Sequence, residues 1–195
     1  MNRSALGLLT VAVVVAGCKE TTDPAGSFTV TGHIDNRTGT AIPANTRILG
    51  VWNVVSGSPD YSYVFGEGTI NRTTGTFEIR FDQPPPSEAL NSNALGVGLI
   101  IATTDQSVQA GDSITSSSPP TGVIGVTAQY AVIFVRNRAT IPATHWANLF
   151  PDGYAVGVGV PAQPPATFDT FAPASRTGSV LIIDDLGNIE IVNWS

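Results

Sequence analysis

Along most of the chain, apolar and polar residues alternate with a period of two over short stretches. The clearest stretch is residues 76–82, where Phe77, Ile79 and Phe81 are separated by charged residues. Such alternation is typical of a strand that packs one face on a core and turns the other to solvent. Residues 27–35 repeat the pattern, whereas other stretches are apolar on both faces, which predicts strands inside a sheet.

These patterns predict an all-β domain. One short helix is expected at residues 142–150, because Pro142 suits a first helical position. Its apolar face would carry Ile141, His145 and Leu149. Frequent turn signals indicate a mainly antiparallel β-sandwich of about 8–10 strands with at most one short helix. Strands are expected at residues 27–35, 46–55, 61–70, 76–82, 95–104, 123–136, 154–160, 180–183 and 188–193, the last two as a hairpin.

Long connections bear on the domain organisation. Residues 105–122 and 161–179 are rich in proline, serine and threonine, and a loop of this length is either functional or a linker. The sequence predicts one β-sandwich domain at residues 27–195. The alternative is a transthyretin-like module at residues 27–104 and a second β unit at residues 123–195, joined by the first of these loops.

The amino-terminal segment has the features of an export signal. An apolar run, Ala5 to Val15, follows Arg3. The run of about eleven residues is too short to cross a hydrocarbon core, which takes roughly 20 residues. Its length, its positive start and the small residues behind it suit a secretory signal peptide.

The residues behind this run, Val15-Ala16-Gly17-Cys18, resemble the lipobox of bacterial lipoproteins. The resemblance implies a signal peptide at residues 1–17, acylation of Cys18 on its thiol and its new amino group, and a polar tether at residues 18–26. Cys18 is the only cysteine, and lipidation gives this lone thiol a reason. The alternatives are a secretory signal with an incidental cysteine and a short membrane anchor.

The residue after Cys18 bears on location. Lys19 stands where inner-membrane lipoproteins of enteric bacteria carry aspartate. By resemblance to that sorting rule, the chain is expected at the outer membrane, facing either the periplasm or the outside. The membrane partner is reached through the lipid on Cys18.

A second resemblance concerns the first half of the domain. Residues 32–43 form a strand, a Thr-Gly turn and an apolar-Pro step, and residues 75–79 form a Gly-x-Phe strand entry. With these pieces, residues 27–104 resemble a carboxypeptidase regulatory-like module, a small transthyretin-like β-sandwich. The sequence departs from that family at Ala44-Asn45, where a Gly-Ala pair is usual. The resemblance implies a scaffold or binding role and carries no catalytic residue.

Charge excludes some functions. The formal net charge is −6, which repels phosphate backbones, so no nucleic-acid partner is expected. No lysine follows Lys19, which excludes Schiff-base chemistry from the domain.

Candidate catalytic groups are sparse. His33 and His145 lie far apart in sequence and lack a partner at metal-ligand spacing. A glycosidase needs a pair of carboxylates, and four acidic residues cluster in sequence: Glu67, Glu78, Asp82 and Glu88. Two of them, Glu78 and Asp82, are expected on the exposed face of a strand. No catalytic residue is predicted.

Metal and cofactor sites are not expected either. Asp184, Asp185 and Asn188 supply oxygen donors, but their spacing does not match an EF-hand loop and a hairpin turn explains them. No metal ion or cofactor is therefore predicted.

Aromatic residues form the candidate ligand-binding surface. Tyr61, Tyr63 and Phe65 share one face of a predicted strand, and Trp52 lies across the preceding turn. Exposed, they would form a platform for sugar rings or a protein partner. In the alternative they belong to the core, with the tyrosine hydroxyls at its rim.

These expectations combine into a functional hypothesis. The chain is expected to be a lipid-anchored cell-envelope protein with a non-catalytic binding or structural role and an unidentified protein or glycan partner. The alternative is an envelope polysaccharide hydrolase that uses carboxylates carried by separate strands.

Overall fold

The computed structural model describes residues 26–53, 61–109, 111–115, 121–160 and 170–185. Within these ranges the chain forms strands and three short 3₁₀ turns, and no α-helix. The all-β prediction is confirmed. The strands are β1 (Phe28–Asn36), β2 (Arg47–Asn53), β3 (Tyr61–Asn71), β4 (Thr76–Phe81), β5 (Leu95–Thr103), β6 (Ser113–Thr115), β7 (Val123–Val126), β8 (Tyr130–Val135), β9 (Gly153–Gly159), β10 (Phe171–Ala174) and β11 (Ser179–Ile183).

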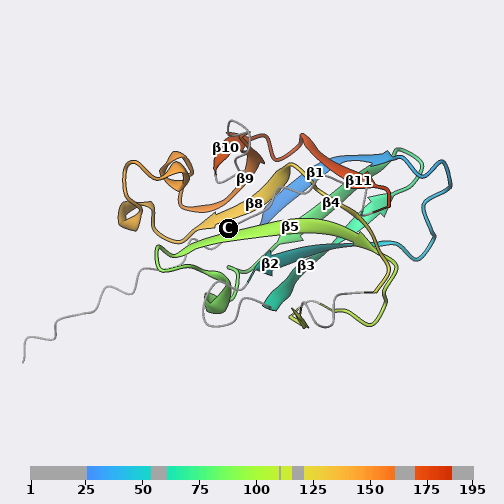
Figure 1. Ribbon diagram of the computed structural model, residues 1–195, viewed down its shortest axis with the longest axis horizontal. Helices are drawn as coiled ribbons and strands as arrows, with labels where there is room; N and C mark the ends of the chain where they lie inside the picture. The colour runs from blue at the N-terminus through green and yellow to red at the C-terminus, as the bar shows by residue number, and fades with distance from the viewer. Residues whose placement is uncertain (1–25, 54–60, 110, 116–120, 161–169, 186–195) are drawn as a thin grey trace, which may run out of the picture.

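The strands form one sheet that closes on itself (Figure 1). Seven strands follow in the order β5-β2-β3-β4-β1-β11-β7, and β7 pairs back with β5. Neighbours in this ring are antiparallel except β1 and β11, which are parallel. The predicted sandwich is therefore corrected to a closed seven-stranded barrel with additional strands.

The additional strands extend the sheet beyond the ring. β8, β9 and β10 continue from β5, and β6 pairs with β3. On one edge β5 pairs with β8 through its first half and with β7 through its second half, while β2 occupies its other edge. β5 is apolar on both faces because both are buried: Ile100 and Ala102 pack in the core inside the barrel, and Leu95 and Ile101 pack in apolar clusters on the other face.

Thr127 occupies the point where β7 and β8 separate. Its backbone N–H donates to the Ile100 carbonyl, and its buried Oγ1 accepts from the Ile100 N–H at 3.2 Å. The same hydroxyl lies 3.1 Å from the Tyr130 carbonyl, to which it donates. Thr127 thus provides hydrogen-bond partners for β5 at the point on this edge that lies between β8 and β7. The strand predicted at residues 123–136 is therefore two strands, β7 and β8.

Strand curvature has an identifiable cause in the β2–β3 pair. The pairing of β2 with β3 shifts register between Leu49 and Val51, and Gly66 in β3 has a φ of 95°. A bulge bends a strand and increases its twist, and a positive φ is readily adopted only by glycine. These features let the sheet curl far enough to close.

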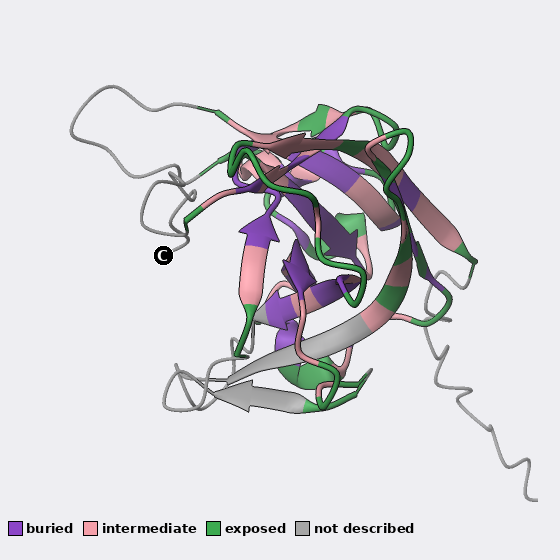
Figure 2. Cartoon of the chain, turned by 90° about the vertical axis from the view of Figure 1, so that its right-hand side faces the viewer, coloured by how far each residue is buried: buried purple, intermediate pink, exposed green. Residues whose placement is uncertain are grey.

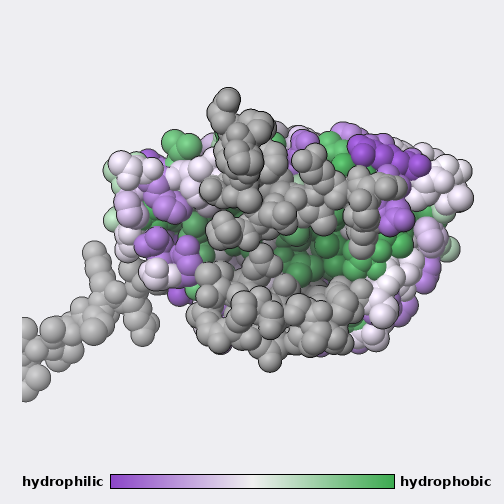
Figure 3. Space-filling model, in the orientation of Figure 1, coloured by the Kyte–Doolittle hydropathy of each residue, from purple (hydrophilic) through white to green (hydrophobic). Residues whose placement is uncertain are grey.

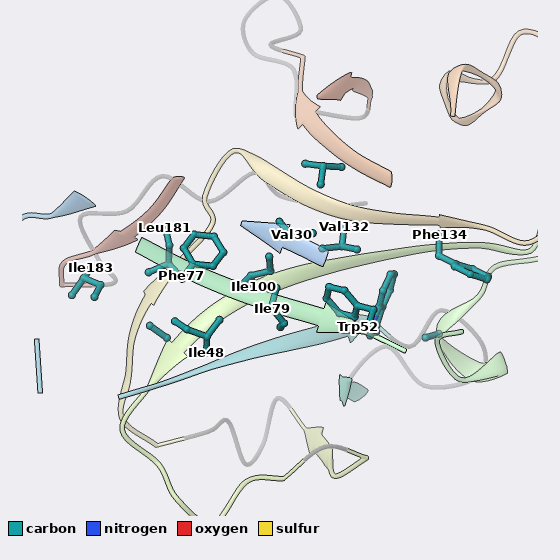
Figure 4. Packing of buried hydrophobic residues seen from close by; sticks show 14 of the residues in the cluster. Val30, Ile48, Trp52, Phe77, Ile79, Ile100, Val132, Phe134, Leu181 and Ile183 are labelled. Atoms are coloured by element: carbon teal, nitrogen blue, oxygen red, sulfur yellow. The ribbon is translucent and has the colours of Figure 1, made fainter. Parts of the chain in front are cut away.

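The main core lies inside the barrel and continues under β8 and β9 (Figure 4). Trp52 has no exposed surface, and its ring lies 6.2 Å from that of Phe81 and 6.0 Å from that of Tyr154. The Tyr154 hydroxyl donates to the Gln83 carbonyl, and burial raises the pKa of Tyr154. Tyr154 also stacks on Phe28, which joins the extension to the barrel.

A second cluster lies on the other face of β8 and β9. It is covered by a segment with two 3₁₀ turns, η2 (Arg138–Thr140) and η3 (Trp146–Leu149). The ring of Trp146 lies 5.8 Å from that of Phe150 and 5.3 Å from that of Phe171. The third 3₁₀ turn, η1 (Ser87–Ala89), precedes β5.

The helix predicted at residues 142–150 is wrong. His145 Nδ1 accepts from the Ala147 N–H at 3.1 Å, and the Asn148 side chain donates to the Ile141 carbonyl at 3.0 Å. Such local side-chain bonds compete with helical pairing of the backbone. The expected apolar face is also absent, because Ile141 is buried while Leu149 is 63% exposed.

A third cluster lies on the outer face of β2, β5 and β7. Leu49, Ile101 and Val126 are buried there, and Val108 of the following loop packs against them. Figure 3 shows apolar surface gathered over the middle of this face. Seen from the end where β1 ends, buried residues line the inside of the barrel and exposed residues occupy the loops (Figure 2).

Most predicted strands are confirmed within a residue or two. The burial of β4 alternates strictly, with Phe77, Ile79 and Phe81 inside. The two predicted long loops each contain a strand, β6 and β10. The hairpin partner predicted at residues 188–193 lies outside the described residues, and within them β11 pairs with β1 and β7. No helix in the described ranges has the length and apolarity needed to cross a membrane.

Candidate functional site

An open groove lies on the outer face of β1, β4 and β3. Strand register builds it from two cross-strand rows. In one row, Thr31 of β1 faces Glu78 of β4, which faces Thr69 of β3. In the other, His33 of β1 faces Thr76 of β4, which faces Asn71 of β3. Residues two apart on neighbouring strands share one face of a sheet, so all six side chains point outward together.

The turn between β10 and β11 forms one wall. The Thr31 N–H donates to the Arg176 carbonyl at 2.8 Å, which holds this turn beside β1. Ser175 Oγ accepts from the Thr177 N–H at 3.2 Å and fixes the turn's shape. The resulting groove has a volume of about 560 Å³ and is lined by Thr31, Gly32, His33, Thr69, Asn71, Thr76, Phe77, Glu78 and Thr177.

Gly32 sets how closely β1 approaches its neighbours. A Cβ at this position would lie 2.1 Å from the Ser179 carbonyl oxygen and 2.6 Å from the Phe77 ring. Any side chain would push β1 away from β11 and from the core. Glycine therefore keeps the parallel β1–β11 pair intact, and with it the wall of the groove.

Neutral hydrogen-bonding groups dominate the groove. Four threonines and Asn71 line it, and its described lining contains no arginine or lysine. Glu78 and His33 are its titratable groups, and both are exposed. The nearest arginine along β4, Arg80, is paired with Asp82 at 2.6 Å. Hydroxyl and amide groups both donate and accept hydrogen bonds, so the groove matches a polar, uncharged ligand surface.

The carboxylates expected for a hydrolase are dispersed. Glu67 pairs with Arg47 at 2.9 Å, and Asp82 pairs with Arg80. Glu78 is the one carboxylate among the described residues that line the groove. Glycoside hydrolysis uses two carboxylates flanking the scissile bond, and that arrangement is not found in this groove.

The aromatic candidates do not come together as a described surface. Trp52 points into the core and is fully buried, so it has no surface on which a ligand can stack. The backbone of β3 contains Tyr61, Tyr63 and Phe65, but their side chains lie outside the described part of the structure.

The two histidines serve different purposes. His33 is exposed on the outer face of β1, as its position in the alternating pattern predicts, and it lines the groove. His145 caps η3 through Nδ1, and its ring lies 5.3 Å from that of Trp146. His145 is thus a structural residue of the covering segment.

Other sequence candidates contribute no site in the described ranges. Asp184 accepts a bond from the Asp185 N–H at 2.8 Å, while Asn188 lies outside the described residues. Among the described residues, no group of three potential metal-binding side chains occurs. Cys18 also lies outside the described residues.

Sequence reasoning missed the groove as a site. Alternation along β1 and β4 marked Thr31 and Glu78 as outward-facing, but only the register shows that Thr69 lies in the same row. Thr177 belongs to a stretch that was expected to be a loop, with no signal that it would border β1.

Comparison with known proteins found no matching family model, curated protein or solved structure.

Proposed function

We propose that the protein is a non-catalytic binding module of the bacterial cell envelope, anchored through lipid on Cys18, and that the polar groove on β1, β4 and β3 is its binding surface. The observation that carries the binding role is the groove itself. It combines a rigid sheet with side chains suited to hydrogen bonding, and its described lining has a single carboxylate. The resemblance of residues 27–104 to a regulatory-like module supports a binding role over a catalytic one.

The position of the groove suits an anchored protein. The tether leads to β1, whose first residue, Phe28, pairs with Phe81 at the end of β4. The groove lies further along β1, toward the turn between β3 and β4. An anchor on Cys18 would therefore attach at one end of the barrel and leave the groove toward the other end. The outer membrane is the proposed location, because Lys19 follows Cys18.

The anchor is tested by substituting Cys18 with alanine. A lipobox signal is acylated at its cysteine, so Cys18→Ala is expected to abolish incorporation of labelled palmitate and to release the domain or stall its processing. Metabolic labelling followed by membrane fractionation measures both outcomes. Uptake of label by the alanine variant at the wild-type level contradicts lipidation at Cys18.

The binding surface is tested by filling the groove. Thr69 is exposed on β3, at one side of the groove, so Thr69→Trp should occupy the groove without disturbing the core. Co-purification of an envelope component with the full chain is expected to fall at least about tenfold, equivalent to about 1.4 kcal/mol. Gln129→Trp, at an exposed position outside the groove lining, is the control and should behave like wild type. Equal recovery with both variants contradicts the proposed site.

A further inference from the structure

β1, β5 and β9 begin at the same end of the barrel. Phe28, at the start of β1, stacks on Tyr154 near the start of β9 at a centroid distance of 5.6 Å. The Arg136 N–H donates to the Ala94 carbonyl, just before β5. The Arg138 N–H donates to Asp152, just before β9, at 2.6 Å. We call this the tether end, because β1, the first strand after the predicted tether, begins here (Figure 1).

The segment at residues 139–151 covers part of this end and contains no lysine, arginine, aspartate or glutamate. Ile141, Ala147 and Phe150 hold its inner side in the second hydrophobic cluster. Leu149 points the other way and is 63% exposed. An exposed leucine is ordinary by itself. Leu149, however, projects from a segment that is packed on the domain and contains no charged residue.

The inner bonds of this segment fix Leu149 in place. The Asn148 side chain donates to the Ile141 carbonyl, and the Phe150 N–H donates to the Ala147 carbonyl at 3.1 Å. The leucine is therefore presented outward by residues on both sides that are tied to the domain. Pro142 and Pro151 are also exposed, which extends the uncharged surface.

Exposed ion pairs occur at both ends of the barrel: Arg80 and Asp82 form one at 2.6 Å at the tether end, where Phe81 pairs with Phe28. Asp35 and Arg37 form an exposed ion pair at 2.7 Å where β1 ends. Arg72, in the β3–β4 turn, donates to the carbonyls of Pro43 and Thr46. Charged groups prefer water to a lipid surface, so at the tether end the lipid contact is confined to the uncharged segment at residues 139–151.

The tether limits how far the tether end can move from an acylated Cys18. Eight residues lie between Cys18 and Ser27, and a fully extended chain spans at most about 3.3–3.6 Å per residue step, or about 30 Å over the whole link. A short flexible link raises the effective concentration of a second contact to about the millimolar range. At this effective concentration, even a weak apolar contact between the tether end and the bilayer is populated.

We infer that the tether end docks on the lipid surface, with residues 139–151 against the headgroups and Leu149 inserted among them. This inference rests on the proposed acylation of Cys18. Docking orients the barrel so that the polar groove is held toward the compartment and away from the bilayer. The occupant of the surface is the membrane that holds the anchor.

The test uses the full acylated protein on vesicles of phosphatidylethanolamine and phosphatidylglycerol. A nitrobenzoxadiazole label is placed at Leu149→Cys and, as control, at Thr73→Cys in the exposed β3–β4 turn at the other end. The label at 149 is expected to show blue-shifted emission and at least about threefold weaker quenching by aqueous iodide than the label at 73. Equal quenching at both positions overturns the inference.

Mass spectrometry of Cys18 separates the two ways of failing. A chain without acyl groups contradicts the proposed anchor, and with it this docking. An acylated, vesicle-bound chain whose two labels are equally quenched contradicts the docking alone.

A second variant checks the role of the leucine. The label is moved to Pro151→Cys, with Leu149 kept, changed to methionine or changed to aspartate. Leu149→Asp is expected to raise iodide quenching at least about threefold, whereas Leu149→Met leaves it unchanged. Because Leu149 is exposed, neither change should unfold the domain, which circular dichroism verifies. Equal quenching in all three proteins shows that Leu149 does not contact the lipid.

Discussion

At the scale of single residues, Asp105 orders the start of the loop after β5. One carboxylate oxygen accepts from the Ser107 N–H at 2.8 Å and from its hydroxyl at 2.6 Å, and the other accepts from the Thr121 hydroxyl at 2.9 Å. These bonds favour the ionised form and lower the pKa of Asp105 to about 2. Arg47 also holds this loop, by donating to the carbonyls of Asp105 and Val108.

The lowered pKa predicts acid sensitivity. The ionised form of Asp105 stabilises the fold above its ordinary pKa of 3.8, and that contribution is lost as the pH falls toward 2. Asp105→Asn should reduce proton uptake on unfolding near pH 3 by somewhat less than one proton. Denaturant unfolding of both proteins between pH 5 and 2 measures this difference. An unchanged pH dependence in the asparagine variant contradicts it.

At the scale of elements, sequence pattern predicted strand identity well and strand partners poorly. The alternation in β4 and the apolar faces of β5 reflect burial, which each stretch records locally. The separation of β7 from β8 depends on the bonds between Thr127 and Ile100, two residues 27 positions apart. Period-two alternation contains no signal for such a long-range bond.

The β1–β11 pair tests how the barrel closes. Gly32→Ala places a methyl group against the Ser179 carbonyl and the Phe77 ring. Overpacking of this kind is expected to lower the free energy of unfolding by about 1–3 kcal/mol. Gly26→Ala is the matched control, because nothing lies within 4 Å of its added Cβ. Chemical denaturation that gives equal stability for both variants contradicts the assigned role of Gly32.

At the scale of the whole molecule, closure of the sheet is what sequence reasoning missed. The sequence predicted a sandwich, whereas β1 and β11, from opposite halves of the chain, pair within one closed ring. The groove depends on that ring, because it joins Thr69, Glu78 and Thr31 to a turn at Thr177. The sequence shows that each of these residues is polar. That they lie together on one surface follows only from the register of the paired strands.

The most direct test of the proposed function is photo-crosslinking in cells. A photoreactive residue is placed at Thr69 in the groove and, separately, at Gln129 outside it, in the full acylated chain. We predict that Thr69 captures one defined envelope component and that Gln129 does not. Capture of the same species at both positions, or no specific capture at Thr69, contradicts the claim that the groove on β1, β4 and β3 is the binding surface.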